Sequence, residues 1–61
     1  MFSEEFKTAR HETGLSQARL AEKTGIPKRT IESWESGVNT PPEWNQRLIL
    51  AELRKLAVNE R

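Results

Sequence analysis

The residues of this sequence that could do chemistry are mainly cations, because the groups that enzymes use as nucleophiles and proton carriers are scarce. The 61 residues include no Cys, no Tyr and one His, and all nine acidic residues are Glu. His11 lies between Arg10 and Glu12 in a polar stretch, where a solvent-exposed side chain is expected. We therefore expect no enzyme activity, no metal site and no cofactor.

Three cations, Arg19, Lys28 and Arg29, instead stand near one another in the central part of the chain. Gln17 and Ser33 flank them and add side chains that both donate and accept hydrogen bonds. Guanidinium and ammonium groups bind phosphate and can donate to guanine O6 and N7, and a hydroxyl can contact most bases. The chemistry that such a set supports is noncovalent recognition of nucleic acid.

Two short helices and a glycine turn must position these side chains. Leu20 marks the inner side of the first helix, and Gly25 can end it because glycine accepts a positive φ at no steric cost. Ile31 and Trp34 lie three residues apart on one face of the second helix. Helix, turn and helix within residues 17–37 is the outline of a helix-turn-helix unit, whose second helix enters the DNA major groove.

The string LSQARLAEKTGIPKRTIESWESG resembles the DNA-binding domain of the Cro/repressor-type (Xre-like) helix-turn-helix family. The resemblance extends over roughly residues 6–51. The sequence departs from the family pattern at Arg19, Pro27 and Ser36, where Glu, a Ser or Thr cap and Asn are usual. The resemblance implies an all-α, lambda-repressor-like bundle of four helices, with a long fourth helix and no fifth. It also implies transcription regulation of prokaryotic or phage type through double-stranded DNA.

We expect one domain over residues 1–61, with helices over about 4–13, 17–24, 28–36 and 41–58. Ser3 is the expected N-cap of the first helix and Ser16 that of the second. Thr40 and Glu43 have the spacing of a capping box for the fourth helix. The last three residues should fray.

No apolar run approaches the ~20 residues of a membrane span, and the N-terminus lacks a signal-peptide pattern. A cytoplasmic protein without membrane contact is therefore the expectation. No small-molecule ligand is expected either.

Charges at the helix starts single out the two central helices. The first and fourth helices begin with Glu, whereas the second and third begin with Arg19, Lys28 and Arg29. The N-terminus of a helix favours an anion, so a cation placed there costs on the order of 0.3–1 kcal/mol of stability by comparison. DNA phosphate lying against these N-termini would explain the pattern. The alternative is a solvated polar face, and the net charge of +1 does not decide between them.

The resemblance implies that Lys28, Arg29 and Ser33 occupy base-reading positions. Gln17 matches the glutamine of the family that contacts phosphate through the start of the second helix. The further expected DNA-backbone contacts are Arg19, Thr30, Asn39 and Thr40. Turn and cap roles are the alternative for Asn39 and Thr40, and Glu32 could accept from cytosine N4 or repel misplaced phosphates.

Arg10 and Glu35 form the expected structural ion pair. Arg10 lies four residues after Phe6, and Glu35 lies four after Ile31, so both charges fall near inward faces of their helices. An unpaired buried charge is very costly, so the two should meet. The family resemblance implies the same pair between the first and third helices.

The fourth helix is apolar on more than one side. One stripe is expected to face the core: Trp44, Leu48 and Ala51. A second stripe is the candidate homodimer face: Leu50, Leu53 and Ala57. A symmetric dimer of this kind would read two half-sites about 34 Å apart.

Two alternatives remain open. Trp34 and Trp44 could stack on single-stranded nucleic acid, although core packing is the expected role of both. The chain could also be a protein-interaction module or an antitoxin-like protein that binds a partner through the apolar fourth helix.

Overall fold

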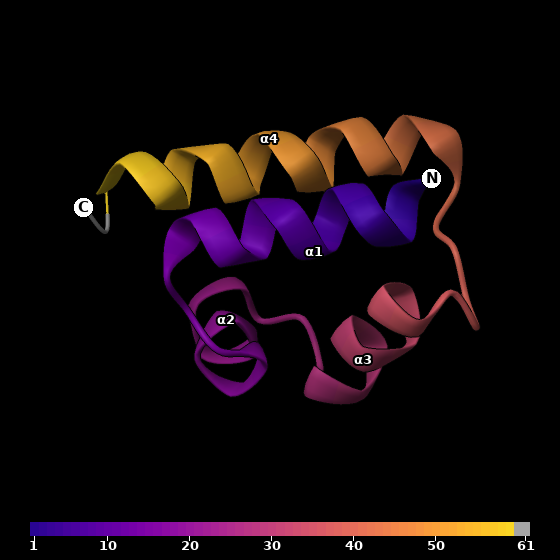
Figure 1. Ribbon diagram of the computed structural model, residues 1–61, viewed down its shortest axis with the longest axis horizontal. Coiled ribbons are helices and arrows are strands. Elements are labelled where there is room, and N and C mark those ends of the chain that lie inside the picture. The colour runs from indigo at the N-terminus through magenta and orange to yellow at the C-terminus, as the bar shows by residue number, and fades with distance from the viewer. Residues whose placement is uncertain (60–61) are drawn as a thin grey trace.

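Two helices lie side by side on one side of the molecule, and two shorter helices lie on the other (Figure 1). The computed structural model describes residues 1–59. Its elements are α1 (Phe2–Thr13), α2 (Gln17–Thr24), α3 (Lys28–Ser36) and α4 (Glu43–Asn59). No strand occurs within residues 1–59. The predicted all-α bundle with a long fourth helix is confirmed, and α2 and α3 form its helix-turn-helix unit.

The turn between α2 and α3 depends on Gly25 and on the threonine before it. Gly25 has a φ of 81°, and its N–H donates to the carbonyl of Ala21 at 2.9 Å. Thr24 Oγ1 donates to the Leu20 carbonyl at 2.8 Å and accepts from the Ile26 N–H at 3.2 Å. These bonds satisfy backbone groups left over at the helix end and turn the chain sharply toward α3.

The end of α1 repeats this arrangement one helix earlier. Thr13 is buried, and its Oγ1 donates to the Arg10 carbonyl and accepts from the Leu15 N–H at 3.1 Å. Gly14 follows it in the left-handed conformation. The pattern Thr-Gly-apolar therefore ends both α1 and α2.

Two of the helix starts differ from the prediction. At α1, Met1 rather than Ser3 is the N-cap, and its carbonyl accepts from the N–H groups of Glu4 and Glu5. The earlier start places Phe2 inside the helix, four residues before Phe6, so both rings reach the core.

At α4 the expected capping box with Thr40 is absent, and the helix begins at Glu43. The residue before a proline is disfavoured in the α region, so Pro42 keeps Pro41 out of the helix. The carbonyl of Pro42 instead accepts the first N–H groups, from Asn45 and Gln46, at 2.9 and 3.0 Å. The helix runs through Asn59; the other two residues expected to fray lie outside the described part of the chain.

One cluster of buried side chains joins α1 to the other three helices. Its members are Phe2, Phe6, Leu20, Ile31, Ile49 and Leu53. Trp34 packs against this cluster and meets the rings of Phe2 and Phe6 edge-on, at centroid distances of 5.9 and 5.5 Å. Trp34 therefore has the expected core role and ties α3 to α1.

The orientation of α4 is the reverse of the one predicted. Trp44 and Leu48 are 69% and 61% exposed, whereas Leu53 is 1% exposed. Leu50 and Ala57, from the candidate dimer face, are half-buried. The expected core stripe faces solvent, and the expected dimer face lies on the core side, so Leu53 cannot reach a partner in the folded chain.

Candidate nucleic-acid interface

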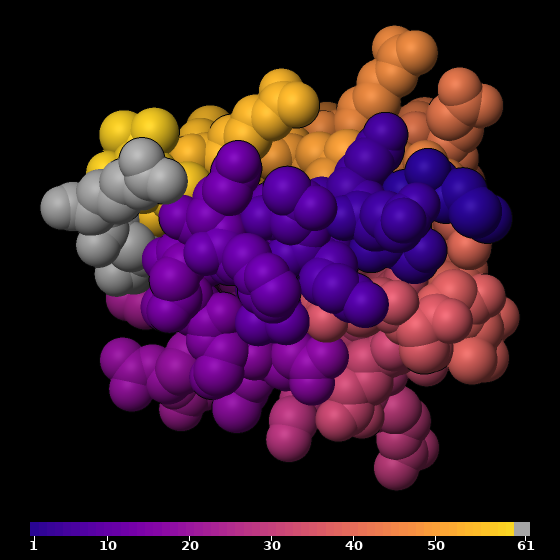
Figure 2. Space-filling view, viewed as in Figure 1, coloured from indigo at the N-terminus to yellow at the C-terminus, as the bar shows by residue number. Residues whose placement is uncertain are grey.

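The interface is built on α3, which buries one side and exposes the other. Ile31 is fully buried and Glu35 is 9% exposed. Lys28 and Arg29, in the first turn, are both exposed. Side chains near the start of α3 project beyond the lower surface of the molecule (Figure 2). The long side chains of Lys28 and Arg29, both hydrogen-bond donors, are therefore accessible to solvent at the start of α3.

Arg10 and Glu35 fix α3 against α1. Arg10 Nε lies 2.5 Å from Glu35 Oε2, and Nη2 donates to Oε1 at 3.2 Å, which gives a two-pronged contact. Arg10 Nη1 also donates to the Leu15 carbonyl at 3.0 Å, at the entrance to α2. A guanidinium has the fork geometry that such a contact requires.

Gln17 extends this network to the first residue of α2. Its Nε2 donates to Glu35 Oε1 at 3.0 Å, so one carboxylate receives bonds from α1 and α2. The side chain of Gln17 therefore holds α2 and α3 together, while its backbone lies at the N-terminus of α2. This bond could not be predicted from the sequence, because it depends on how α2 packs against α3, and that packing produces no repeating pattern of residues along the chain.

Burial has the largest single effect on the pKa of Glu35 and raises it, whereas the hydrogen bonds from Arg10 and Gln17 lower it. The charges of Arg10 and Lys7 act in the same direction. The net effect holds the pKa of this carboxyl below its ordinary value of 4.5. Glu35 is therefore charged at neutral pH and remains a partner for Arg10.

The starts of α2 and α3 show the charge pattern read from the sequence. Neither helix has an acidic residue in its first turn, whereas α1 and α4 do. The side chain of Arg19 is exposed, and its Nε lies 3.9 Å from Oε1 of Glu22 in the same helix. The N–H of Arg19 donates to the side chain of the N-cap Ser16 at 3.1 Å. The cation thus extends outward from a well-formed helix start.

The remaining predicted contact residues occupy the edges of the interface. Ser33 and Thr30 are half-buried on α3. Asn39 and Thr40 are exposed in the loop after it. The Ser33 carbonyl accepts from the N–H groups of Val38 and Asn39 at 3.1 and 3.4 Å, so this loop is folded back onto α3.

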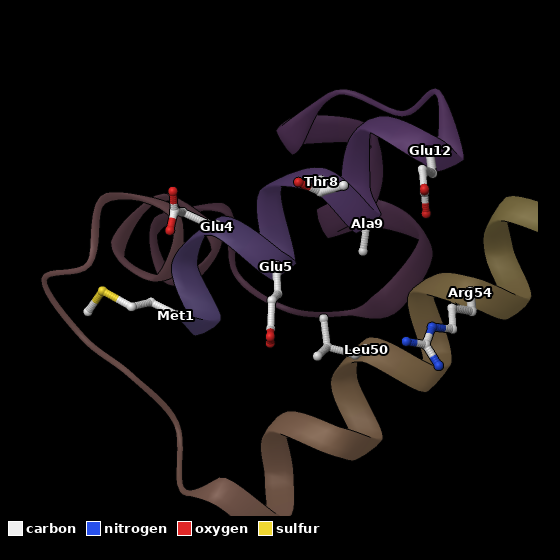
Figure 3. Close-up of a pocket in the computed structure, with 8 residues that line it drawn as sticks. All are labelled: Met1, Glu4, Glu5, Thr8, Ala9, Glu12, Leu50 and Arg54. Atoms are coloured by element: carbon white, nitrogen blue, oxygen red, sulfur yellow. The ribbon is translucent and has the colours of Figure 1, made fainter.

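The surface between α1 and α4 has a different character. A groove between α1 and α4 is lined by Glu4, Glu5 and Glu12 on one side and by Arg54 on the other (Figure 3). Leu50 forms part of its floor. Carboxylates repel phosphate, so this groove is poorly suited to nucleic acid.

Within residues 1–59 no helix is long and apolar enough to cross a membrane. The same residues contain no cluster of three or more His or Glu side chains that could hold a metal ion. Arg10, Gln17 and Glu35 converge where α1, α2 and α3 meet.

A chain with this arrangement is a helix-turn-helix protein, and comparison with protein families agrees. The profile of the helix-turn-helix domain matches residues 2–61. The chain therefore belongs to the helix-turn-helix domain family of Cro/repressor (Xre-like) type, a family of DNA-binding domains. No curated protein and no solved structure gives a significant match.

Proposed function

We propose that this protein is a sequence-specific regulator of transcription that places α3 in the major groove of double-stranded DNA. The exposure of Lys28 and Arg29 at the start of α3, opposite the buried Ile31 and Glu35, carries the proposal. A helix held in this way can insert its outer side into the groove while its inner side stays packed.

The base contacts would come from Lys28 and Arg29, with Ser33 one turn later. Arg29 can donate two hydrogen bonds to guanine O6 and N7, the commonest specific contact in the major groove. The contacts to the DNA backbone would come from Gln17, Arg19, Thr30, Asn39 and Thr40. These contacts set the position of the protein along the duplex without reading the sequence.

The mechanism is occupancy of a site rather than catalysis. Regulation would follow from excluding RNA polymerase or recruiting it, depending on where the site lies relative to a promoter. The ion pair of Arg10 and Glu35, with Gln17, would keep α2 and α3 at one angle, so that phosphate and base contacts form together.

A salt titration tests the proposal. The affinity for a labelled duplex, followed by fluorescence anisotropy, should fall linearly on a log–log plot as salt is raised. Arg19→Ala, which removes a proposed phosphate contact, should reduce the slope by about one unit. Arg54→Ala, which removes a cation from α4, is the matched control and should leave the slope unchanged. Binding that ignores salt, or an Arg19→Ala slope equal to that of the unmodified protein, contradicts the proposal.

A further inference from the structure

The exposed side of α3 carries one acidic residue beside its cations. Glu32 is exposed and lies four residues after Lys28 and three after Arg29, so the three side chains leave the same side of the helix. The other acidic residue of α3, Glu35, is buried and paired with Arg10. The proposed function assigns base contacts to Lys28 and Arg29 and leaves Glu32 without a role.

No contact within the protein explains a carboxylate at Glu32. This side chain makes no ion pair and no hydrogen bond within residues 1–59. Lys28 lies near it along the helix, but a lysine that precedes a glutamate by four residues is the weaker order for a helical ion pair. Glu32 also lies after the first turn of α3, so it gains little from the positive end of the helix dipole. A role toward a ligand is therefore the remaining explanation.

Glu32 would lie close to base edges if α3 enters the major groove, and this step rests on the proposed function. Phosphates repel a carboxylate, and a carboxylate that loses its water must accept hydrogen bonds to offset the cost. Base edges in the major groove offer two kinds of donor, the N4 amino group of cytosine and the N6 amino group of adenine. A carboxylate on the exposed side of α3 therefore restricts which bases can lie opposite it.

Cytosine suits a carboxylate better than adenine does. Adenine has the acceptor N7 beside its N6 amino group, so its edge both attracts and repels a carboxylate. Cytosine presents its N4 donor without an acceptor on the same base, and the paired guanine presents O6 and N7 to a cation. Glu32 beside Lys28 and Arg29 thus has the charge pattern that complements G·C base pairs.

We propose that Glu32 selects cytosine by accepting a hydrogen bond from its N4 amino group, close to the guanine that Arg29 contacts. The same carboxylate rejects guanine and thymine, because their groove edges present the acceptors O6, N7 and O4. A carboxylate placed against these acceptors would be desolvated without a donor. Specificity at this position comes from rejection of wrong bases as well as from attraction to the right one.

Selection of duplexes from a random pool by Glu32 variants tests the proposal. The unmodified protein should enrich a motif with a cytosine near the guanine. Glu32→Ala should lose a preference of about tenfold for that cytosine. Glu32→Gln should prefer adenine there, because a glutamine amide can donate to N7 and accept from N6. Glu12→Gln, which removes the same charge from an exposed position of α1, is the matched control and should enrich the original motif.

A chemically modified duplex tests the hydrogen bond itself. N4-Methylcytosine keeps the N–H that pairs with guanine and loses the one that faces the major groove. Placed at the selected cytosine, it should weaken binding of the unmodified protein about tenfold, as measured by fluorescence anisotropy. Glu32→Ala should bind the methylated and unmethylated duplexes equally. Circular dichroism should show that each variant keeps the helix content of the unmodified chain.

An unchanged motif for Glu32→Gln overturns the proposal and leaves the proposed function intact. Tighter binding of Glu32→Gln to every duplex, without a change of motif, also overturns it, because that result shows that Glu32 only repels phosphate. Equal sensitivity of Glu32→Ala and the unmodified protein to the methyl group has the same consequence. If the unmodified protein enriches no motif, the proposed function fails together with this proposal.

Discussion

Arg10 of α1 and Glu35 of α3 form a nearly buried ion pair, with side chains only 13% and 6% exposed. Glu35 also accepts from Gln17 at the start of α2, so one carboxylate connects three helices. Since α3 is short, its angle to the rest of the molecule depends on few contacts. The ion pair and the Gln17 bond are the polar side-chain contacts that hold α3 against α1 and α2.

Removing one partner of this pair should be costly. Arg10→Ala leaves Glu35 buried without its cation, and we expect a loss of roughly 3 kcal/mol in the free energy of unfolding. Urea denaturation followed by circular dichroism measures this loss of unfolding free energy. Replacing both residues together, with Arg10→Met and Glu35→Leu, should cost much less because no unpaired charge remains. A single variant as stable as the unmodified protein would refute the pairing.

Acidification should weaken the same contact. The folded chain holds the pKa of Glu35 below the ordinary value of 4.5, so the unfolded chain takes up the proton more readily. The contribution of Glu35 to stability is therefore complete above that ordinary value and is lost as pH falls through the lower, folded-state pKa. Unfolding free energies measured from neutral to acid pH should fall less steeply for Glu35→Gln than for the unmodified chain. Equal slopes would show that the pKa of Glu35 is not depressed.

The turn at Gly25 should tolerate little change. A Cβ at this position would meet no atom within 4 Å, so the cost of substitution comes from the φ of 81° alone. We expect Gly25→Ala to lower the unfolding free energy by about 1 kcal/mol, and Gly25→Asn to lower it less, because Asn adopts this conformation more readily. Thermal melts of the two variants should show that order. Equal stability of Gly25→Ala and the unmodified chain would contradict the account of the turn.

The orientation of α4 can be tested with two leucines. Leu53 is 1% exposed and Leu48 is 61% exposed. Leu53→Ala should cost about 2–5 kcal/mol because it leaves a cavity, whereas Leu48→Ala should change stability by no more than about 0.5 kcal/mol. The reverse order would restore the orientation expected from the sequence.

The ends of the short helices could be predicted because they are encoded locally. Ser16 accepts from the N–H of Arg19, and Gly25 takes a left-handed conformation, in each case within four residues along the chain. The pairing of Arg10 with Glu35 follows from a simple requirement, since two opposite charges near inward faces must find partners. The Thr-Gly-apolar pattern at Thr13 and Thr24 was also present in the sequence and could have been read in the same way.

The orientation of α4 could not be predicted, because both of its sides are apolar. Spacing alone identifies two stripes, and the choice between them depends on how α4 approaches α1 and the α2–α3 turn. In the structure Ile49 and Leu53 join the cluster around Phe6, which leaves Trp44 outside. The bond from Gln17 to Glu35 depends on tertiary approach in the same way.

The central claim is that α3 reads bases through Arg29, and selection of duplexes from a random pool tests it most directly. The unmodified protein should enrich a short motif that contains a guanine. Arg29→Ala should lose about 1–3 kcal/mol of discrimination at one position of that motif. Arg54→Ala should enrich the original motif unchanged. A pool without any enriched motif, or an identical motif for Arg29→Ala, would contradict the claim.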